Sequence, residues 1–210
     1  MHSHVVTDFD RHVTNWVVGH RTPELTAAMR VITWIGSWVA VALTGAMVLA
    51  LIVVKRLSIA HLLIFSLAWA GEYAMVTLTK YAVDRPRPPE RLWLVTAHGA
   101  SFPSGHAANA TLVCVTASLV ASFLLRQRIA RTVTVVVASL VMVAVGFSRV
   151  ELGVHWTSDV LAGSLVAVAW LAVVGRVVAL TATDHDRMAP GISRSTVNST
   201  GRQAMVRACR

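Results

Sequence analysis

Long apolar runs separated by short polar connectors dominate this chain of 210 residues. A helix needs about 20 mostly apolar residues to cross the hydrocarbon core of a bilayer. Five runs reach or approach that length, at residues 31–54, 57–79, 107–125, 132–147 and 160–183. The fourth is short unless its helix continues into Ser148 and Arg149. We therefore expect an all-α, polytopic integral membrane bundle with five transmembrane helices.

The charged residues are few and cluster at the ends of these runs. Only 14% of the residues are charged, whereas soluble domains carry about 25%. The net charge of +9 does not indicate nucleic-acid binding, because basic residues are concentrated at run ends and in the C-terminal tail. The basic connectors are residues 55–56, 126–131 and the tail at 184–210. The positive-inside rule places them in the cytoplasm, and the intervening loops on the extracytoplasmic face of a cell membrane.

The N-terminal residues differ from the apolar runs. Apolar side chains recur there at helical spacing, at Phe9, Val13, Trp16 and Val17. This spacing predicts an amphipathic helix in the membrane interface, and Thr22-Pro23 predicts the start of a second short helix. The alternative is a partly ordered tail. We expect an interfacial segment at 1–30, a transmembrane domain at 31–183 and a disordered basic tail at 184–210.

A cationic segment follows the second apolar run. Lys80 ends that run, and Arg87 stands seven residues later between two prolines. Prolines restrict the backbone and so fix where the guanidinium points. Arginine forms bidentate hydrogen bonds with phosphate oxygens, and lysine supplies a point charge. Alternatively, these cations only extend from a helix end to the membrane surface. We expect the same of Arg85 and Arg91, unless they meet lipid headgroups.

The third apolar run opens with the sequence Pro103-Ser104-Gly105-His106. Ser104 is a favourable N-cap, and Gly105 allows a ligand close to the backbone. The free amide groups and the dipole at a helix start favour an anion, and His106 in the first turn faces the same point. The alternative is a capped helix start with an interfacial histidine.

A third segment combines Ser148 and Arg149 with His155 and Asp159. Residues four apart share one face of a helix. Asp159 can therefore accept a hydrogen bond from one ring nitrogen of His155 and leave the other nitrogen a lone pair for nucleophilic attack. Arg149 adds a third cation for an anionic group. The alternative is an ion pair at a helix start.

Together, these segments resemble the tripartite signature of the type-2 phosphatidic acid phosphatase superfamily. The matching residues are Lys80-x6-Arg87-Pro88, Pro103-Ser104-Gly105-His106 and Ser148-Arg149-x5-His155-x3-Asp159. That superfamily holds lipid phosphate phosphatases, undecaprenyl pyrophosphate phosphatases and, more distantly, glucose-6-phosphatases and vanadium haloperoxidases. Members of this size commonly have six transmembrane helices. Either the segment before residue 31 replaces the first helix, or that helix is missing.

The resemblance implies a role for each matching residue. His155 would be the nucleophile that forms a phosphohistidine, Asp159 would orient it, and His106 would protonate the leaving oxygen and then activate water. The phosphate ligands would be Lys80, Arg87, Ser104, Gly105 and Arg149. The family requires no metal and no other cofactor for this reaction, and the sequence offers no carboxylate cluster for magnesium.

The expected function is hydrolysis of a phosphomonoester or pyrophosphate on a lipid carrier. Undecaprenyl pyrophosphate, phosphatidic acid and phosphatidylglycerophosphate are the candidate substrates. A phosphatase of a soluble phosphate ester would share the site, and a non-enzymatic lipid-phosphate binding or transport protein would need only the cations and the helix start. The two histidines with Asp159 argue against pure binding. No feature of the sequence indicates an oligomeric state.

Glu72 lies inside the second apolar run, at membrane depth. Ionisable residues there are costly and commonly functional. Glu72 could partner a cation of the site or lie on a proton path. The alternative, which we favour, is a glutamic acid hydrogen-bonded between helices.

Overall fold

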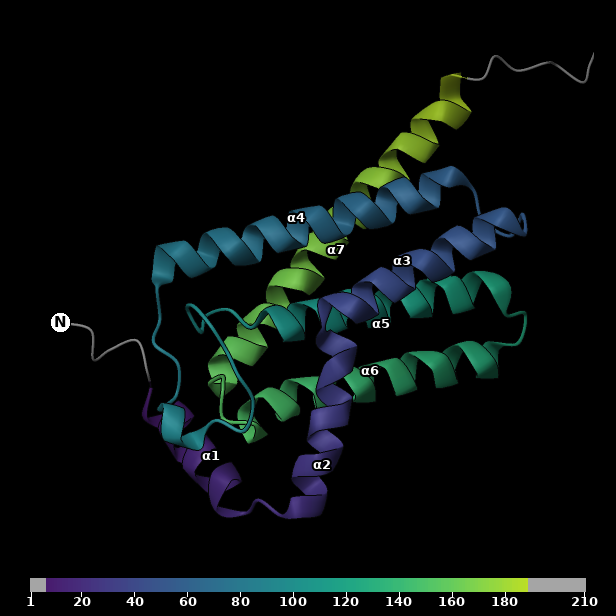
Figure 1. Ribbon diagram of the computed structural model, residues 1–210. Helices are drawn as coiled ribbons and strands as arrows, with labels where there is room; N and C mark the ends of the chain where they lie inside the picture. Colours follow the sequence, from purple (N-terminus) through teal and green to yellow (C-terminus); the bar gives the residue numbers. More distant parts are fainter. Residues whose placement is uncertain (1–6, 189–210) are drawn as a thin grey trace, which may run out of the picture. The chain divides into compact units, whose positions relative to one another are not determined.

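The computed structural model describes residues 7–188, which form helices and loops with no strand among them (Figure 1). Two short helices come first, α1 (Asp8–Gly19) and α2 (Pro23–Ile32). The other elements are η1 (Thr33–Gly36), α3 (Trp38–Val53), α4 (Ile59–Val83), η2 (Glu90–Leu92), α5 (Gly105–Leu124), α6 (Arg128–Glu151) and α7 (Thr157–Met188). The predicted all-α class is confirmed for this part of the chain.

Four helices are long and apolar enough to cross a membrane: α4, α5, α6 and α7 as far as Thr181. They correspond to four of the predicted runs. Helix α6 continues through Ser148 and Arg149 to Glu151, which gives the fourth run the length it needed. Counting the broken segment formed by α2, η1 and α3 as one span brings the number to five.

The first predicted run, residues 31–54, is not one helix. The segments Pro23–Gly36 and Trp38–Val53 meet at an angle of 50°. Gly36 lies against α5, where an added Cβ would come within 2.5 Å of the carbonyl oxygen of His106. Ser37 is extended, and its side chain accepts a hydrogen bond from the backbone N–H of Ala40 at 3.4 Å, which starts α3. A close long-range contact and a new N-cap therefore interrupt an apolar run that hydropathy alone joins.

Among the described residues, those up to Val174 form one compact unit and those from Gly175 onward a second. Within the first unit, α3, α4, α5 and α6 run alongside one another (Figure 1). Val41, Ala68 and Leu112 form a buried cluster between α3, α4 and α5. In the second unit, α7 continues to Met188. This is five residues past the predicted boundary, and residues 189–210 of the predicted tail lie outside the described residues.

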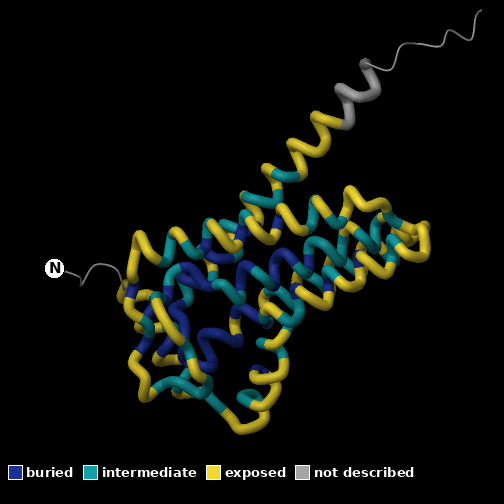
Figure 2. The backbone as a smooth tube through the Cα atoms, turned by 45° about the horizontal axis from the view of Figure 1, so that its top comes forward, coloured by how far each residue is buried: buried dark blue, intermediate teal, exposed yellow. Residues whose placement is uncertain are grey.

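Burial is concentrated at one end of the bundle, as Figure 2 shows. The buried residues of α5 lie between Ala107 and Cys114, in its first half. Those of α6 lie between Val145 and Glu151, at its last turns. Leucines elsewhere on the helices are exposed, including Leu43, Leu67, Leu140 and Leu165. The helices therefore present apolar side chains outward and keep polar groups inside at one end, as expected of a membrane protein.

Helix α1 packs its polar side against the rest of the first unit. Its buried residues are Asp10, Thr14 and Val17, whereas Phe9 and Trp16 are more than half exposed. The predicted start of the second short helix is present, because the Thr22 side chain accepts a hydrogen bond from Leu25 N at 3.2 Å with Pro23 at the first position. The predicted apolar residues therefore do not share one face, because Phe9 and Trp16 lie outward and Val17 packs inward.

Candidate active site

The candidate site lies where the C-terminal ends of α4 and α6 meet the N-terminal ends of α5 and α7. The predicted residues come from these ends and the loops between them: Lys80, Arg87, Ser104, Gly105, His106, Arg149, His155 and Asp159. Electrostatic interactions join His106 to Arg149, His155, Arg87 and Lys80. The structure therefore brings together residues that are up to 79 positions apart in the sequence.

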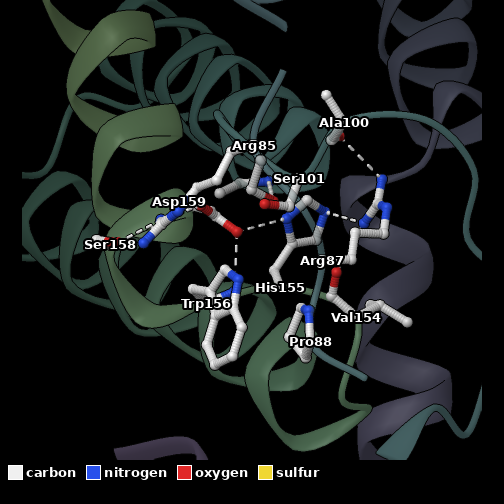
Figure 3. Close-up of polar contacts among 12 residues, drawn as sticks. Arg85, Arg87, Pro88, Ala100, Ser101, Val154, His155, Trp156, Ser158 and Asp159 are labelled. Carbon is white, nitrogen blue, oxygen red and sulfur yellow. Dashed lines mark hydrogen bonds and ion pairs between the residues drawn. The ribbon is translucent and has the colours of Figure 1, made fainter. Parts of the chain in front are cut away.

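His155 and Asp159 form the predicted pair, in a geometry that differs from the expected one. His155 lies before the first residue of α7, so the two do not share a helix face. The chain instead turns at the helix start, where Asp159 Oδ2 accepts from Trp156 N at 2.9 Å and lies 3.4 Å from His155 Nδ1 (Figure 3). The carboxylate thus fixes both the turn and the imidazole.

The contacts of His155 define its tautomer. Arg87 Nη1 lies 3.1 Å from His155 Nε2. A guanidinium only donates hydrogen bonds, so Nε2 is the acceptor and the ring proton resides on Nδ1, facing Asp159. Burial lowers the pKa of His155 from 6.5 to about 4, with the charges of Arg87 and Arg149 adding to this and the hydrogen bond to Asp159 opposing it. At neutral pH the imidazole is uncharged, with a lone pair on Nε2.

Arg87 is held by carbonyl groups from two loops. Its Nη1 donates to Val154 O at 2.7 Å, and its Nε donates to Gly99 O at 2.9 Å. Lys80 Nζ donates to Ala100 O at 2.7 Å, in the same loop. Both cations therefore lie at one rim of the site. Burial lowers the pKa of Arg87, and the charge of Asp159 opposes this change.

The prolines on either side of Arg87 anchor its loop. Pro86 O accepts a hydrogen bond from the indole of Trp156 at 2.9 Å, and Pro88 O accepts from the indole of Trp93 at 2.8 Å. The two prolines restrict the backbone as predicted, and hydrogen bonds to both of their carbonyl groups hold it in place. Together they fix the position of the Arg87 Cα.

The start of α5 supplies the predicted helix N-terminus. Ser104 Oγ accepts from Ala107 N at 3.4 Å, and Ser104 N donates to Asp159 O at 2.9 Å. Gly163 of α7 lies so close to Ser104 that an added Cβ would clash with its carbonyl oxygen. The N-cap of α5 and the first turns of α7 are therefore packed directly on each other. This contact places His106 and His155 in the same site.

Arg149 is almost completely buried at the end of α6. Its Nη1 donates to Thr33 Oγ1 at 2.8 Å, and its Nε has no hydrogen-bond partner among the described residues. The broken segment between α2 and α3 thus positions this cation through Thr33. A buried guanidinium with a free donor is suited to an anionic ligand.

Arg85 was missed as a site residue, and its predicted location at the membrane surface is wrong. Its side chain is only 2% exposed. Nη1 donates to Asp159 Oδ1 at 2.5 Å (Figure 3). Nη2 donates to Asp10 Oδ2 at 2.7 Å. The two carboxylates that offset its desolvation lie 74 and 75 residues away in the sequence, so no local pattern could identify them. The adjacent Pro86, which restricts the backbone at Arg85, was the only feature of the sequence that pointed to a fixed position for this side chain.

Asp10 completes this network from α1. Its Oδ1 accepts from Ser158 N at 2.9 Å, and its Oδ2 accepts from Ser158 Oγ at 2.7 Å. Burial raises the pKa of Asp10, but the hydrogen bonds from Ser158 and Arg85 together outweigh it, so the pKa is lowered overall. The N-terminal helix is therefore connected to the first turn of α7 and to the catalytic candidate Asp159.

The site combines an uncharged, oriented imidazole with several fixed cations. Within residues 7–188, no group of three or more His, Cys, Asp or Glu side chains is arranged to hold a metal ion. Cations and a helix N-terminus can bind a phosphoryl group, and an oriented imidazole nitrogen can attack it. The second histidine, His106, can transfer a proton.

Comparison with known proteins shows what the whole chain is similar to. A model of the PAP2 superfamily matches residues 60–181, which is more than half of the chain. Phosphatidylglycerophosphatase B of Bacillus subtilis (strain 168) is 29% identical over 176 residues, covering 78% of this chain and 80% of that protein.

Two solved structures share the fold. The transmembrane PAP2 type phosphatidylglycerolphosphate phosphatase from Bacillus subtilis superposes with a TM-score of 0.72 at 27% identity, covering 83% of this chain and 86% of that one. LpxE of Aquifex aeolicus gives a TM-score of 0.64 at 20% identity, covering 81% of this chain and 96% of the other. This second likeness supports the fold alone.

Proposed function

The chain belongs to the PAP2 superfamily, and on this premise we propose that it removes phosphate from a lipid carrier through a phosphohistidine intermediate. It is a membrane phosphatase, as its family and its similarity to phosphatidylglycerophosphatase B indicate. The single observation that supports the mechanism is the tautomer of His155. Its Nδ1 faces Asp159 at 3.4 Å, and its Nε2 is the acceptor of a hydrogen bond from Arg87.

We assign the attack to His155 Nε2. The lone pair forms a bond to phosphorus while the bond from phosphorus to the lipid oxygen breaks. The imidazole gains positive charge, which Asp159 stabilises across the Nδ1 hydrogen bond. Arg87 Nη1, which contacts Nε2 in the absence of a phosphoryl group, donates to a phosphoryl oxygen instead.

His106 serves the leaving group and then the water. It takes a proton from the substrate, which binds as the phosphate monoanion, and gives it to the lipid oxygen as that oxygen departs. It then takes a proton from the water that attacks the phosphohistidine. That second attack breaks the bond between nitrogen and phosphorus, releases inorganic phosphate and returns His155 to its neutral form. The reaction is balanced by one water molecule and requires no redox partner.

Phosphate binding is assigned to the cations and the start of α5. Lys80, Arg87 and Arg149 neutralise the charge on the phosphoryl oxygens, and Ser104 and Gly105 supply the helix N-terminus. This set provides the charge stabilisation that a metal gives in other phosphatases, so we propose that catalysis is independent of divalent metal.

The membrane arrangement is proposed as follows. Helices α3 to α7 make five passes, with α1 in the interface on the side of the active site. The exposed Phe9 and Trp16 of α1 support this, because amphipathic aromatic rings favour the interface. The basic connectors at 55–56 and 126–131 leave the opposite ends of the helices, which supports a cytoplasmic location for them and an extracytoplasmic active site.

The lipid substrate is proposed to be one of three. Phosphatidylglycerophosphate has the support of the relative's name, and phosphatidic acid and undecaprenyl pyrophosphate present the same terminal phosphate. A soluble phosphate ester would use the same residues. Phosphate release from these lipids and from a sugar phosphate, measured side by side in detergent with EDTA, separates the substrate classes.

The mechanism is tested with His155→Ala in the same assay. We expect loss of phosphate release, and formation of an acid-labile phosphoenzyme in the wild type only. His12→Ala is the matched control, because His12 is an exposed histidine of α1. Equal activity of His155→Ala and wild type would overturn the nucleophile assignment. Inhibition by EDTA would overturn metal independence, and binding without turnover of any lipid would favour a binding or transport protein.

A further inference from the structure

A cavity of about 550 Å³ extends from the candidate active site along α4. Lys80 and His106 line one end of it, and Glu72 lines it two helical turns away. Glu72, Val76 and Lys80 are four residues apart and so lie on one face of α4. The Cα atoms of Glu72 and Lys80 are about 12 Å apart at the usual helical rise. The cavity is thus long enough to hold more of a substrate than its phosphate.

The cavity adjoins the lipid-facing surface. Trp38, Tyr73 and Tyr81 line it and are all more than 60% exposed. Tryptophan and tyrosine at such positions favour the zone between headgroups and acyl chains. A lipid can therefore place its phosphate beside Lys80 and His106 while its backbone runs toward Glu72.

Glu72 is a buried carboxyl group with an unpaired oxygen within the described part of the chain. It is 1% exposed, and its Oε2 has no hydrogen bond to any described residue. No ion pair within residues 7–188 involves it. The sequence predicted a hydrogen bond from Glu72 to a neighbouring helix or, alternatively, an ion pair with a cation of the site. Glu72 Oε2 makes neither contact with the described residues. An unpaired buried polar atom costs free energy, so a group that pairs with it on binding gains affinity.

The possible substrates differ in the chemical groups next to their phosphate, which is the part that would lie near Glu72. A glycerolipid phosphate carries ester carbonyl groups or a free hydroxyl on its glycerol backbone, a few bonds from the phosphate. A polyprenyl phosphate has only hydrocarbon beyond its phosphate oxygen. A carboxyl group can donate to a carbonyl when protonated and can accept from a hydroxyl in either state. Only the glycerolipid therefore satisfies Glu72.

We propose that Glu72 is a specificity-determining residue that hydrogen-bonds to the glycerol backbone of the lipid and so selects glycerolipid phosphates over polyprenyl phosphates. The proposal rests on the lipid phosphatase function proposed above. It assigns to Glu72 a contact with the non-reacting part of the substrate, so the residue affects selectivity and takes no part in phosphoryl transfer.

The test compares Glu72→Leu and Glu72→Gln with the wild type on four substrates. These are diacyl phosphatidic acid, its dialkyl ether analogue, lysophosphatidic acid and farnesyl monophosphate. A lost hydrogen bond lowers kcat/KM by roughly threefold to tenfold. We expect that loss in Glu72→Leu on the diacyl and lyso lipids, no loss on farnesyl phosphate, and a smaller effect in Glu72→Gln. The ether analogue has neither an ester carbonyl nor a free hydroxyl, so we expect no loss on it.

A turnover-free measurement distinguishes this proposal from the proposed function. The same lipids are titrated against His155→Ala and against the double variant with Glu72→Leu, and thermal stabilisation reports binding. Selective loss of glycerolipid binding in the double variant supports the role of Glu72, even if the wild type hydrolyses none of the lipids. An equal fold-loss on all four substrates, or an unchanged preference in the double variant, would overturn it.

Discussion

At the scale of single residues, the arginine between two carboxylates has the largest structural consequence. Arg85 contacts both Asp159 and Asp10 and is itself buried. Removing one partner of a buried ion pair leaves the other charge uncompensated, which costs about 3–5 kcal/mol. Arg85 also fixes the Asp159 oxygen that His155 does not use. It therefore acts as a positioning residue for the carboxylate that orients the imidazole.

We predict that Arg85→Lys lowers kcat by roughly 10–100-fold with little change in KM, by analogy with the outer partners of metal-ligating histidines. A lysine keeps the charge but cannot contact both carboxylates through separate nitrogens. Steady-state kinetics and the melting temperature of both proteins provide the test. Arg91→Lys, an exposed arginine in the same loop, is the control. A change confined to KM would assign Arg85 to substrate binding instead.

The titration of His155 is a second prediction at this scale. Burial holds its pKa at about 4, below the ordinary 6.5. As pH falls from 6.5 toward 4, the unfolded chain takes up a proton at this position before the folded chain does, so the free energy of unfolding decreases over that range. We expect the histidine ring signal that is absent in His155→Ala to titrate near pH 4 by NMR in micelles.

Arg87→Gln should raise that pKa, because the charge of Arg87 contributes to lowering it. A wild-type midpoint at or above 6.5, or a downward shift in Arg87→Gln, would contradict the electrostatic description of the site.

The residues of the site were largely predictable, and their contacts were not. Residue type and spacing, together with the resemblance to the family signature, predicted that Lys80, Arg87, His106, Arg149, His155 and Asp159 gather at one site, because phosphoryl transfer needs cations, a nucleophile and an acid. Arg85 could not be found this way, because a cation near a helix end looks the same whether it faces water or two distant carboxylates. The position of Asp10 opposite Arg85 depends on how α1 packs.

At the scale of elements, the break between η1 and α3 links the membrane helices to the active site. Gly36 lies against the carbonyl of His106, and Asn109 Nδ2 donates to Gly36 O at 3.2 Å. Just before the break, Thr33 holds Arg149. Hydropathy sums the apolarity of neighbouring residues, so it located the other four spans. For the same reason it predicted a single helix over residues 31–54, where the structure has a break. The break results from contacts with α5 and α6.

We predict that Gly36→Ala destabilises the protein by about 1–3 kcal/mol, the usual cost of overpacking. The new methyl group would lie 2.5 Å from His106 O and 2.8 Å from Val145 Cγ1, so either α5 or α6 must shift. Because His106 moves with α5, kcat should fall as well. Thermal unfolding and kinetics measure the two effects. Gly19→Ala, where no atom lies within 4 Å of the new methyl group, is the matched control. Equal behaviour of the two variants would show that the contact has no effect.

At the scale of the whole molecule, the proposed topology makes the two ends of the bundle chemically distinct. The end with the active site carries the exposed loop residue His98, and the other end carries the exposed connector residue Gln127 between α5 and α6. The chain has two cysteines, Cys114, which is buried in α5, and Cys209, which lies outside the described residues. Replacing Cys209 by serine therefore leaves a background that reacts little with thiol reagents.

In that background, we predict that His98→Cys reacts with a membrane-impermeant maleimide in intact cells, whereas Gln127→Cys reacts only after the membrane is permeabilised. The physical reason is the distribution of basic residues, since the basic connectors at 55–56 and 126–131 flank one end of the spans and the positive-inside rule predicts a cytoplasmic location for such connectors. The reverse labelling pattern would show that the protein has the opposite orientation in the membrane and releases phosphate in the cytoplasm. Labelling of both positions from outside would mean that α5 does not span the membrane, which contradicts its length and apolarity.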